Sequence, residues 1–149
     1  MSINPGTPAI ITSITETVQV RIDPGYNVVN VTSTIALPST VSSSTSGVSV
    51  SGTTVVAPES GRNTKVYAYA LTTTGIVPIT ARFTNGAGTS PTEFWRVALQ
   101  APSAVSTGAN LAIQPPGYLF ATGVNTTLAL RLDSATLVHY SVSYFKESA

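Results

Sequence analysis

The C-terminal part of the chain alternates strictly between apolar and polar residues. From position 138 to position 144 every second residue is apolar, and each residue between them is polar. This period of two residues is typical of a β-strand with one face in a core and the other in solvent. We predict that the apolar set faces inward and the polar set outward. The apolar set is Val138, Tyr140, Val142 and Tyr144, and the polar set is His139, Ser141 and Ser143.

Short segments with strand patterns, separated by turn residues, fill most of the remaining chain. Asp23-Pro24-Gly25 joins two of them and predicts a hairpin. No stretch combines apolar residues at helical spacing with capping signals, so we expect little or no helix. About nine or ten such strands fit a sandwich, a jelly roll or a closed barrel, and we predict an all-β fold, an antiparallel β-sandwich or jelly roll with an extended N-terminal arm. The expected strands are 15–23, 27–37, a short one within 48–56, 65–71, 78–83, 92–99, 110–113, 119–121, 126–132 and 137–145.

The first 14 residues differ from the rest and predict an arm. They carry two prolines, isolated isoleucines and no charge, a composition that builds no core alone. We divide the chain into this arm, residues 1–14, and a β domain, residues 15–149, with a subdivision near residues 57–61 as the alternative. Within the β domain, residues 38–46 are mostly Ser and Thr, and we interpret them as a flexible loop or linker.

The chain is poor in charge, which excludes several kinds of partner. Only 9% of its residues are charged and the net charge is +1, so no stripe of Lys and Arg is available to neutralise nucleic-acid phosphates. Its 18 Ser and 23 Thr supply polar surface instead. The N-terminus has no signal-peptide pattern, and no apolar run approaches the roughly 18 residues of a membrane helix. We therefore expect no nucleic-acid and no membrane partner, and a surface suited to a crowded assembly.

The residues that carry most enzyme chemistry are few and scattered. The chain has no Cys and one His, and its six acidic residues form no close pair in sequence, so neither a metal site nor a glycosidase pair is indicated. His139 stands near Asp133 and Ser141, but a nucleophile elbow is missing, and a surface histidine is the better interpretation. We predict no enzyme activity and no cofactor.

Residues 54–146 carry a series of structural motifs. A Val-Val-Ala-Pro start leads through Ser-Gly-Arg into a strand, an apolar strand precedes a Pro-Pro-Gly-Tyr-Leu-Phe-Ala-Thr turn, and a Leu-x-Leu-x-Leu strand precedes the final one. In these motifs the chain resembles a small all-β module of tailed-bacteriophage virion proteins. The resemblance implies a jelly roll or related β-sandwich that trimerises as a capsid-decoration, head-fibre or tail-associated part. The motifs are Val55–Gly75, Phe94–Leu99, Pro115–Thr122, Leu128–Leu132 and Val138–Tyr144.

We therefore expect a virion structural protein that binds the outside of a phage head and stabilises it as a homotrimer. Such a protein would be made in the host cytoplasm and located on the capsid surface of the virion, with the major capsid protein or other virion proteins as partners. The alternative is a receptor- or carbohydrate-binding module of a fibre or tail. The residues predicted to bind a partner are Ile3, Pro5, Pro8, Ile10, Ile11 and Ile14 in the arm, and Trp95.

Trp95 has two interpretations. An exposed Trp could stack on a sugar or anchor a subunit contact, whereas we favour packing in the core or in an interface. Tyr67 and Tyr69 are two residues apart, and we expect both to pack against the opposite sheet. Four cations could pair with a neighbouring subunit, although isolated strand charges are usually solvated. They are Arg62, Lys65, Arg82 and Arg131.

Overall fold

The structure is a computed structural model, and it describes residues 13–22, 27–46, 52–100 and 107–149. Within these residues the chain forms eleven strands and no helix, as the sequence predicts. The chain divides into two compact units, Met1–Leu37 and Pro38–Ala149. The compact units meet at residues 37 and 38. The sequence predicts a boundary between an arm and a β domain after residue 14, or a subdivision near residues 57–61, and this division stays a prediction.

The described part of the first unit is a two-stranded hairpin. β1 (Ser13–Ile22) pairs antiparallel with β2 (Asn27–Ala36), from Ser13 opposite Ala36 to Ile22 opposite Asn27. Its sheet contains no third strand among the described residues. The predicted hairpin is therefore confirmed, and Ser13 and Ile14 belong to β1. The rest of the predicted arm, residues 1–12, lies outside the described residues.

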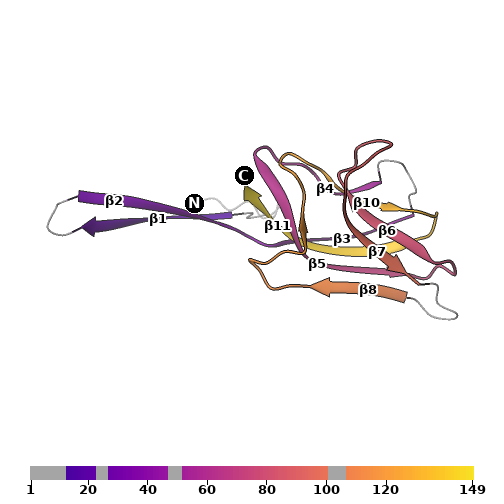
Figure 1. Cartoon of the computed structure of the whole chain (residues 1–149). Coiled ribbons are helices and arrows are strands. Elements are labelled where there is room, and N and C mark those ends of the chain that lie inside the picture. The colour runs from indigo at the N-terminus through magenta and orange to yellow at the C-terminus, as the bar shows by residue number, and fades with distance from the viewer. Residues whose placement is uncertain (1–12, 23–26, 47–51, 101–106) are drawn as a thin grey trace, which may run out of the picture. The chain divides into compact units, whose positions relative to one another are not determined.

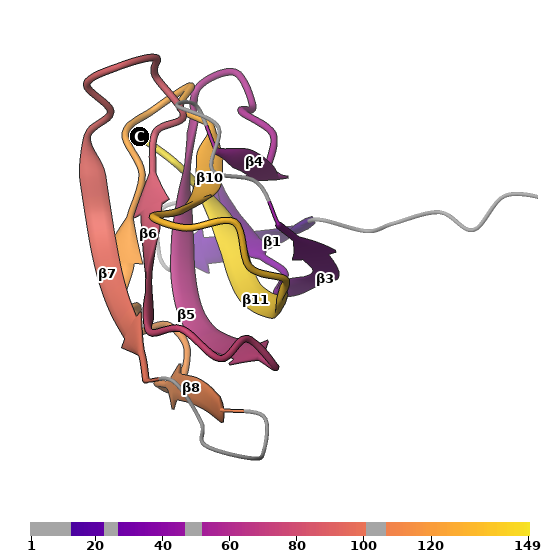
Figure 2. The ribbon, with the colours of Figure 1, turned by 90° about the vertical axis from the view of Figure 1, so that its right-hand side faces the viewer.

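The second unit is a β-sandwich of two antiparallel sheets, shown in Figures 1 and 2. The four-stranded sheet has the order β4-β10-β6-β7, and the five-stranded sheet has the order β3-β11-β5-β8, with β9 also paired to β5. The predicted fold class is confirmed. The strands are β3 (Ser39–Thr45), β4 (Thr53–Val56), β5 (Arg62–Thr73), β6 (Ile79–Thr84), β7 (Glu93–Leu99), β8 (Thr107–Ala112), β9 (Phe120–Ala121), β10 (Leu128–Leu132) and β11 (Val138–Ser148).

The core lies between the two sheets and contains an aromatic cluster. Phe83 is completely buried, and its ring centroid lies 5.8 Å from that of Tyr69 and 5.2 Å from that of Phe120. The alternation of the last strand is confirmed in β11. Its apolar positions face the core, with Tyr144 half-buried against it, and His139 is exposed. The fully or nearly buried positions are Val138, Tyr140 and Val142.

A bulge at Tyr67 changes which residues of β5 face the core. Ser143 pairs with Ala68 but Tyr144 pairs with Val66, so Tyr67 is left without a partner in β11. The ring of Tyr67 lies 6.3 Å from that of Phe145, outside the core cluster. The expectation that Tyr67 and Tyr69 share the core face is therefore right for Tyr69 and wrong for Tyr67, because the extra residue reverses the alternation.

The Ser/Thr-rich segment interpreted as a loop is a strand. β3 pairs with β11 without a register shift, from Ser39 opposite Tyr144 to Thr45 opposite Val138. Ser42 donates a hydrogen bond to Ser141 Oγ at 2.9 Å, and Val41 packs against the core. The interpretation was wrong because short hydroxyl side chains suit a pleated surface and pair across strands, so low complexity does not imply a loop.

Because Phe83 fills the centre of the aromatic cluster, Phe83→Ala should destabilise the sandwich by about 3–5 kcal/mol. His139→Ala on the exposed face of β11 is the control and should change stability by less than about 0.5 kcal/mol. Urea unfolding followed by circular dichroism measures both. Equal stabilities of the two variants would contradict the described core.

Candidate interaction surfaces

The described residues contain neither a metal-ligating cluster nor a triad around His139. They contain no cluster of three or more His, Cys, Asp or Glu side chains that could hold a metal ion, and no helix long and apolar enough to cross a membrane. Asp133 Oδ1 accepts the backbone N–H of Thr80 at 2.8 Å, and Ser141 accepts Ser42. No hydrogen bond of the described residues links either of them to His139, so the sequence neighbours of His139 do not form a triad with it.

The structure describes two of the residues predicted to bind a partner. Ile14 in β1 is 52% exposed. Trp95 in β7 is half-buried, with its ring 5.8 Å from that of Phe120 at an interplanar angle of 16°. Its Nε1 donates a hydrogen bond to Tyr69 Oη at 3.3 Å, so Trp95 packs against the core, the interpretation that the sequence favoured. The other residues of the set lie outside the described residues; they are Ile3, Pro5, Pro8, Ile10 and Ile11. Partner binding by the whole set stays a prediction.

The charged side chains of the sandwich fall into two groups, and the first neutralises itself. Glu59 forms ion pairs with Arg62 and with Lys146, each at 3.1 Å. Lys65 pairs with Glu147, and its Nζ also lies 4.8 Å from the centroid of the Tyr118 ring. Every member therefore has a partner of opposite charge. We call this group the paired cluster; it contains Glu59, Arg62, Lys65, Lys146 and Glu147.

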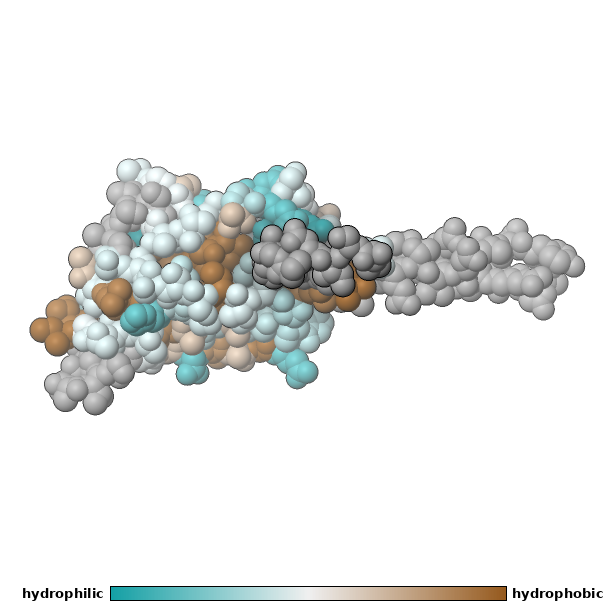
Figure 3. Space-filling view, turned by 180° about the vertical axis from the view of Figure 1, so that it is seen from behind, coloured by the Kyte–Doolittle hydropathy of each residue, from teal (hydrophilic) through white to brown (hydrophobic). Residues whose placement is uncertain are grey.

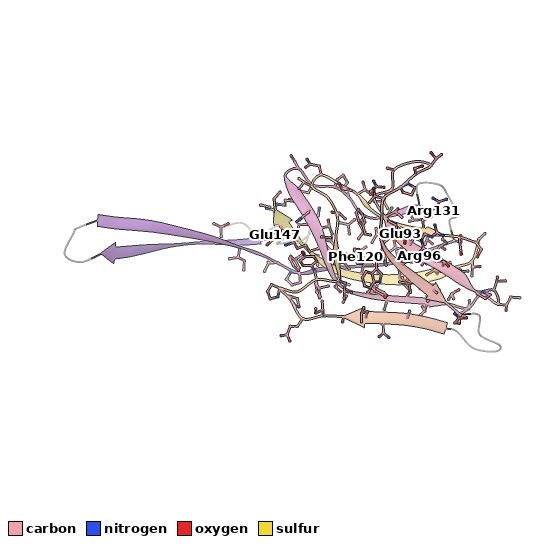
Figure 4. All side chains as sticks on the ribbon, viewed as in Figure 1. Glu93, Arg96, Phe120, Arg131 and Glu147 are labelled. Atoms are coloured by element: carbon pink, nitrogen blue, oxygen red, sulfur yellow. The ribbon has the colours of Figure 1, made fainter. Side chains whose placement is uncertain are left out.

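The second group contains three arginines that lie side by side on adjacent strands. Arg131 of β10 is opposite Arg82 of β6, and Arg82 is opposite Arg96 of β7. Each follows a core-facing residue and precedes another, so all three lie on the outward face of the four-stranded sheet. Like charges directly opposite each other on neighbouring strands repel. We call these three residues the arginine row; Figure 4 labels two of them, Arg96 and Arg131, with Glu93.

Glu93 partly neutralises the arginine row. Arg96 donates two hydrogen bonds to its carboxylate, from Nε at 2.9 Å and from Nη2 at 3.0 Å. Arg82 Nε is 3.7 Å from Glu93 Oε2, which is too long for a hydrogen bond. The hydrogen bond from Arg96 lowers the pKa of Glu93 and outweighs the opposite effect of burial, and the charges of Arg96 and Arg82 lower the pKa further. Glu93 therefore stays ionised in mildly acidic solution.

The other end of the arginine row borders a small cleft. The cleft has a volume of about 200 Å³ and is lined by Arg82, Arg131, Leu132 and Asp133. No ion pair or hydrogen bond joins the Arg131 side chain to another described residue. Arg82 Nε is buried and also makes no hydrogen bond. Both arginines thus line the cleft with hydrogen-bond donors that no described residue accepts, beside Asp133, whose Oδ1 accepts a hydrogen bond from Thr80.

The sequence alone does not predict the arginine row, because Arg82 and Arg131 stand in separate predicted strands. The three arginines are far apart in sequence, and only the register of β10, β6 and β7 brings them together. One local signal was present, because each arginine occupies a polar position between apolar residues of its own strand. Knowledge of the strand pairing would have been needed to combine the three.

The four edge strands of the sandwich differ in how they are protected. β4 is only four residues long, and β7 carries the charged residues Glu93 and Arg96. A short strand and charged side chains both oppose pairing of an edge with another chain. β3 and β8 have no charge, no proline and no register shift within their pairing. Leu111 in β8 and the adjacent Ile113 are 41% and 44% exposed. β3 and β8 are therefore unprotected edges.

Exposed apolar residues also gather on two loops of the sandwich. Ile76 is 84% exposed and Val77 is 52% exposed in the β5–β6 connection, and Leu137 is 45% exposed just before β11. The two loops lie together, because Thr73 Oγ1 donates a hydrogen bond to the Leu137 carbonyl at 2.8 Å. Figure 3 shows such hydrophobic residues on a surface that is otherwise mostly weakly polar. These three exposed aliphatic side chains therefore lie on adjacent loops.

Comparison of the sequence with protein-family models gave no match, and comparison with curated proteins gave none either. Function is therefore inferred from the surfaces described above.

Glu93→Gln should lower the free energy of unfolding at neutral pH by about 0.2–1 kcal/mol, because it leaves Arg96 and Arg82 without their carboxylate partner. The pKa of Glu93 is lower in the folded protein, so its contribution is present above the unfolded value of about 4.3 and is lost as the pH falls through the folded value. Urea unfolding of both proteins from pH 7 to pH 2 measures the difference. A difference that does not shrink in acid would contradict the role given to Glu93.

Proposed function

We propose that this chain is a virion structural protein that binds the outside of a phage head and stabilises it. The observation that carries the proposal is the division of the chain into a sandwich with its own core and a separate two-stranded hairpin. A hairpin of two strands is at best marginally stable in water, and more strands or a packing surface are needed to stabilise it. The hairpin is therefore suited to attachment, and the sandwich to display.

The sequence before β1 supports attachment through this end of the chain. Residues 1–12 are uncharged and contain three isoleucines and two prolines. Burying such side chains contributes about 25 cal/mol per Å² of apolar area, which must exceed the cost of ordering the backbone. An extended segment of this kind can add a strand to the edge of a partner's sheet. The partner in our proposal is the major capsid protein or another virion protein.

The unprotected edges support a homotrimer. β3 and β5 both run antiparallel to β11, and β8 runs antiparallel to β5, so β3 and β8 point in opposite directions. Rotation about an axis parallel to the strands preserves these directions. The β8 edge of one copy then meets the β3 edge of the next in antiparallel pairing, and three copies close a ring in which the five-stranded sheets have no free edge. The trimer also agrees with the resemblance to phage virion modules.

The alternative, a receptor- or carbohydrate-binding module, gains no support from the described residues. Its anchor would be Trp95, whose ring stacks on Phe120 and whose N–H bonds to Tyr69. A sugar platform needs an aromatic face that is open to solvent.

Deletion of residues 1–37 should leave the thermal stability of the sandwich nearly unchanged and weaken binding to heads that lack this protein by at least about tenfold, or about 1.4 kcal/mol. Deletion of residues 1–12 alone, which keeps the hairpin, should weaken binding by a smaller factor. Calorimetry and co-sedimentation with purified heads measure the two effects. Equal binding by the full-length protein and both truncated proteins would show that this end of the chain is not the attachment.

A charge exchange tests the proposed β3–β8 contact. Ser42, Ser141, Ala70 and Asn110 form one row across the five-stranded sheet, so Ser42 and Asn110 lie at the same height on the two edges. Ser42→Lys should reduce the trimer to a monomer of about 15.4 kDa. Adding Asn110→Glu should restore the trimer, because the two edges then carry opposite charges.

Light scattering after size-exclusion chromatography measures these masses, and Thr89→Lys on the exposed β6–β7 loop is the charge-matched control. Monomeric wild-type protein at micromolar concentration would contradict the trimer. A trimer that Ser42→Lys leaves intact would place the subunit contact elsewhere.

A further inference from the structure

The arginine row differs from the paired cluster in having one cation, Arg131, without a partner among the described residues, and Arg82 has only a long ion pair with Glu93 at 3.7 Å. In the paired cluster, each Lys or Arg has a carboxylate partner within the sandwich. In the arginine row, Glu93 makes its hydrogen bonds to Arg96, whereas Arg131 pairs with no described residue. Arg82 and Arg131 lie directly opposite each other, and their like charges repel. A bound anion would remove this repulsion.

The cleft beside these two arginines has the size and the donors for a small anion. Its volume of about 200 Å³ can hold a small carboxylate such as acetate, and Arg82 and Arg131 both line it. Arg82 Nε is a buried donor without an acceptor, and leaving such a donor unsatisfied is unfavourable. Opposite residues on adjacent strands have Cβ atoms about 4.5–5.5 Å apart, so both side chains can reach one ligand. Planar guanidinium groups match the two oxygens of a carboxylate.

We propose that the cleft between Arg82 and Arg131 binds a carboxylate group. The two oxygens of the carboxylate accept hydrogen bonds from N–H groups of the two arginines, which have donors only. Asp133 lines the same cleft and carries its own negative charge, which favours a singly charged anion over a phosphate dianion. Glu93 and Asp133 flank the row, so it is not the continuous stripe of cations that binds nucleic acid. The site belongs to the sandwich alone and does not depend on the proposed function.

Nuclear magnetic resonance of the arginine Nε–Hε groups tests the site in the full-length protein. Sodium acetate replaces sodium chloride at constant ionic strength, and the Arg82 and Arg131 signals should shift and saturate together. The Arg62 signal, whose guanidinium pairs with Glu59, should not follow the same curve. Shifts that grow linearly in all five arginines would overturn the proposal, because they would report non-specific screening.

Variants and a second anion make the test specific. Arg131→Gln should raise the acetate concentration at half-saturation of the Arg82 signal at least tenfold, and Arg131→Lys should raise it less, because charge is kept and the planar donor pair is lost. Arg62→Gln removes the same charge from the paired cluster and should leave the curve unchanged. Saturation by inorganic phosphate but not by acetate would overturn the carboxylate assignment, and so would an unchanged curve in Arg131→Gln.

Discussion

The pairing of β5 with β11 is the contact on which the rest of the sandwich depends. It joins Arg62–Thr73 to Val138–Ser148 over almost the full length of both strands. Val66 and Leu71 on one strand and Val138 and Val142 on the other are completely buried by it. Because residues on alternate faces of a strand exchange places when the register slips by one, this pairing also decides which side chains reach the surface. β3, β8 and β9 are positioned by the same two strands.

Strand register likewise places the arginine row on the opposite, four-stranded sheet. The register of β10, β6 and β7 puts Leu130, Phe83 and Trp95 in one inward row and the three arginines in the adjacent outward row. The packing of the inward face against the core thus determines which charged side chains lie next to each other on the outward face. The arginine row is therefore held by the rigid sheet rather than by flexible loops, and a rigid set of donors loses less conformational entropy when it binds an anion. The described residues of the hairpin unit, by contrast, form a ladder of backbone pairs and no second layer.

The sequence predicted those parts of the molecule that local patterns determine. The alternation of β11, the hairpin and the all-β class follow from periods of two residues and from turn residues, and the structure confirms them. Three features depended on contacts that no local pattern contains. β3 was missed because its strand character comes from hydroxyl pairs with β11, and the position of Tyr67 because one extra residue reverses the alternation. The arginine row was missed because its members meet only through register, while the predicted arm residues up to Ile11 lie outside the described chain.

The central proposal is that the hairpin end of the chain attaches the sandwich to the outside of a phage head. Cryo-electron microscopy of purified heads, with and without added full-length protein, tests it most directly. The account predicts difference density on the outer capsid surface at positions of three-fold symmetry, with the first unit, Met1–Leu37, against the capsid and the sandwich projecting from it. Density only at the tail, or sandwiches that contact the capsid while the hairpin points away, would contradict it.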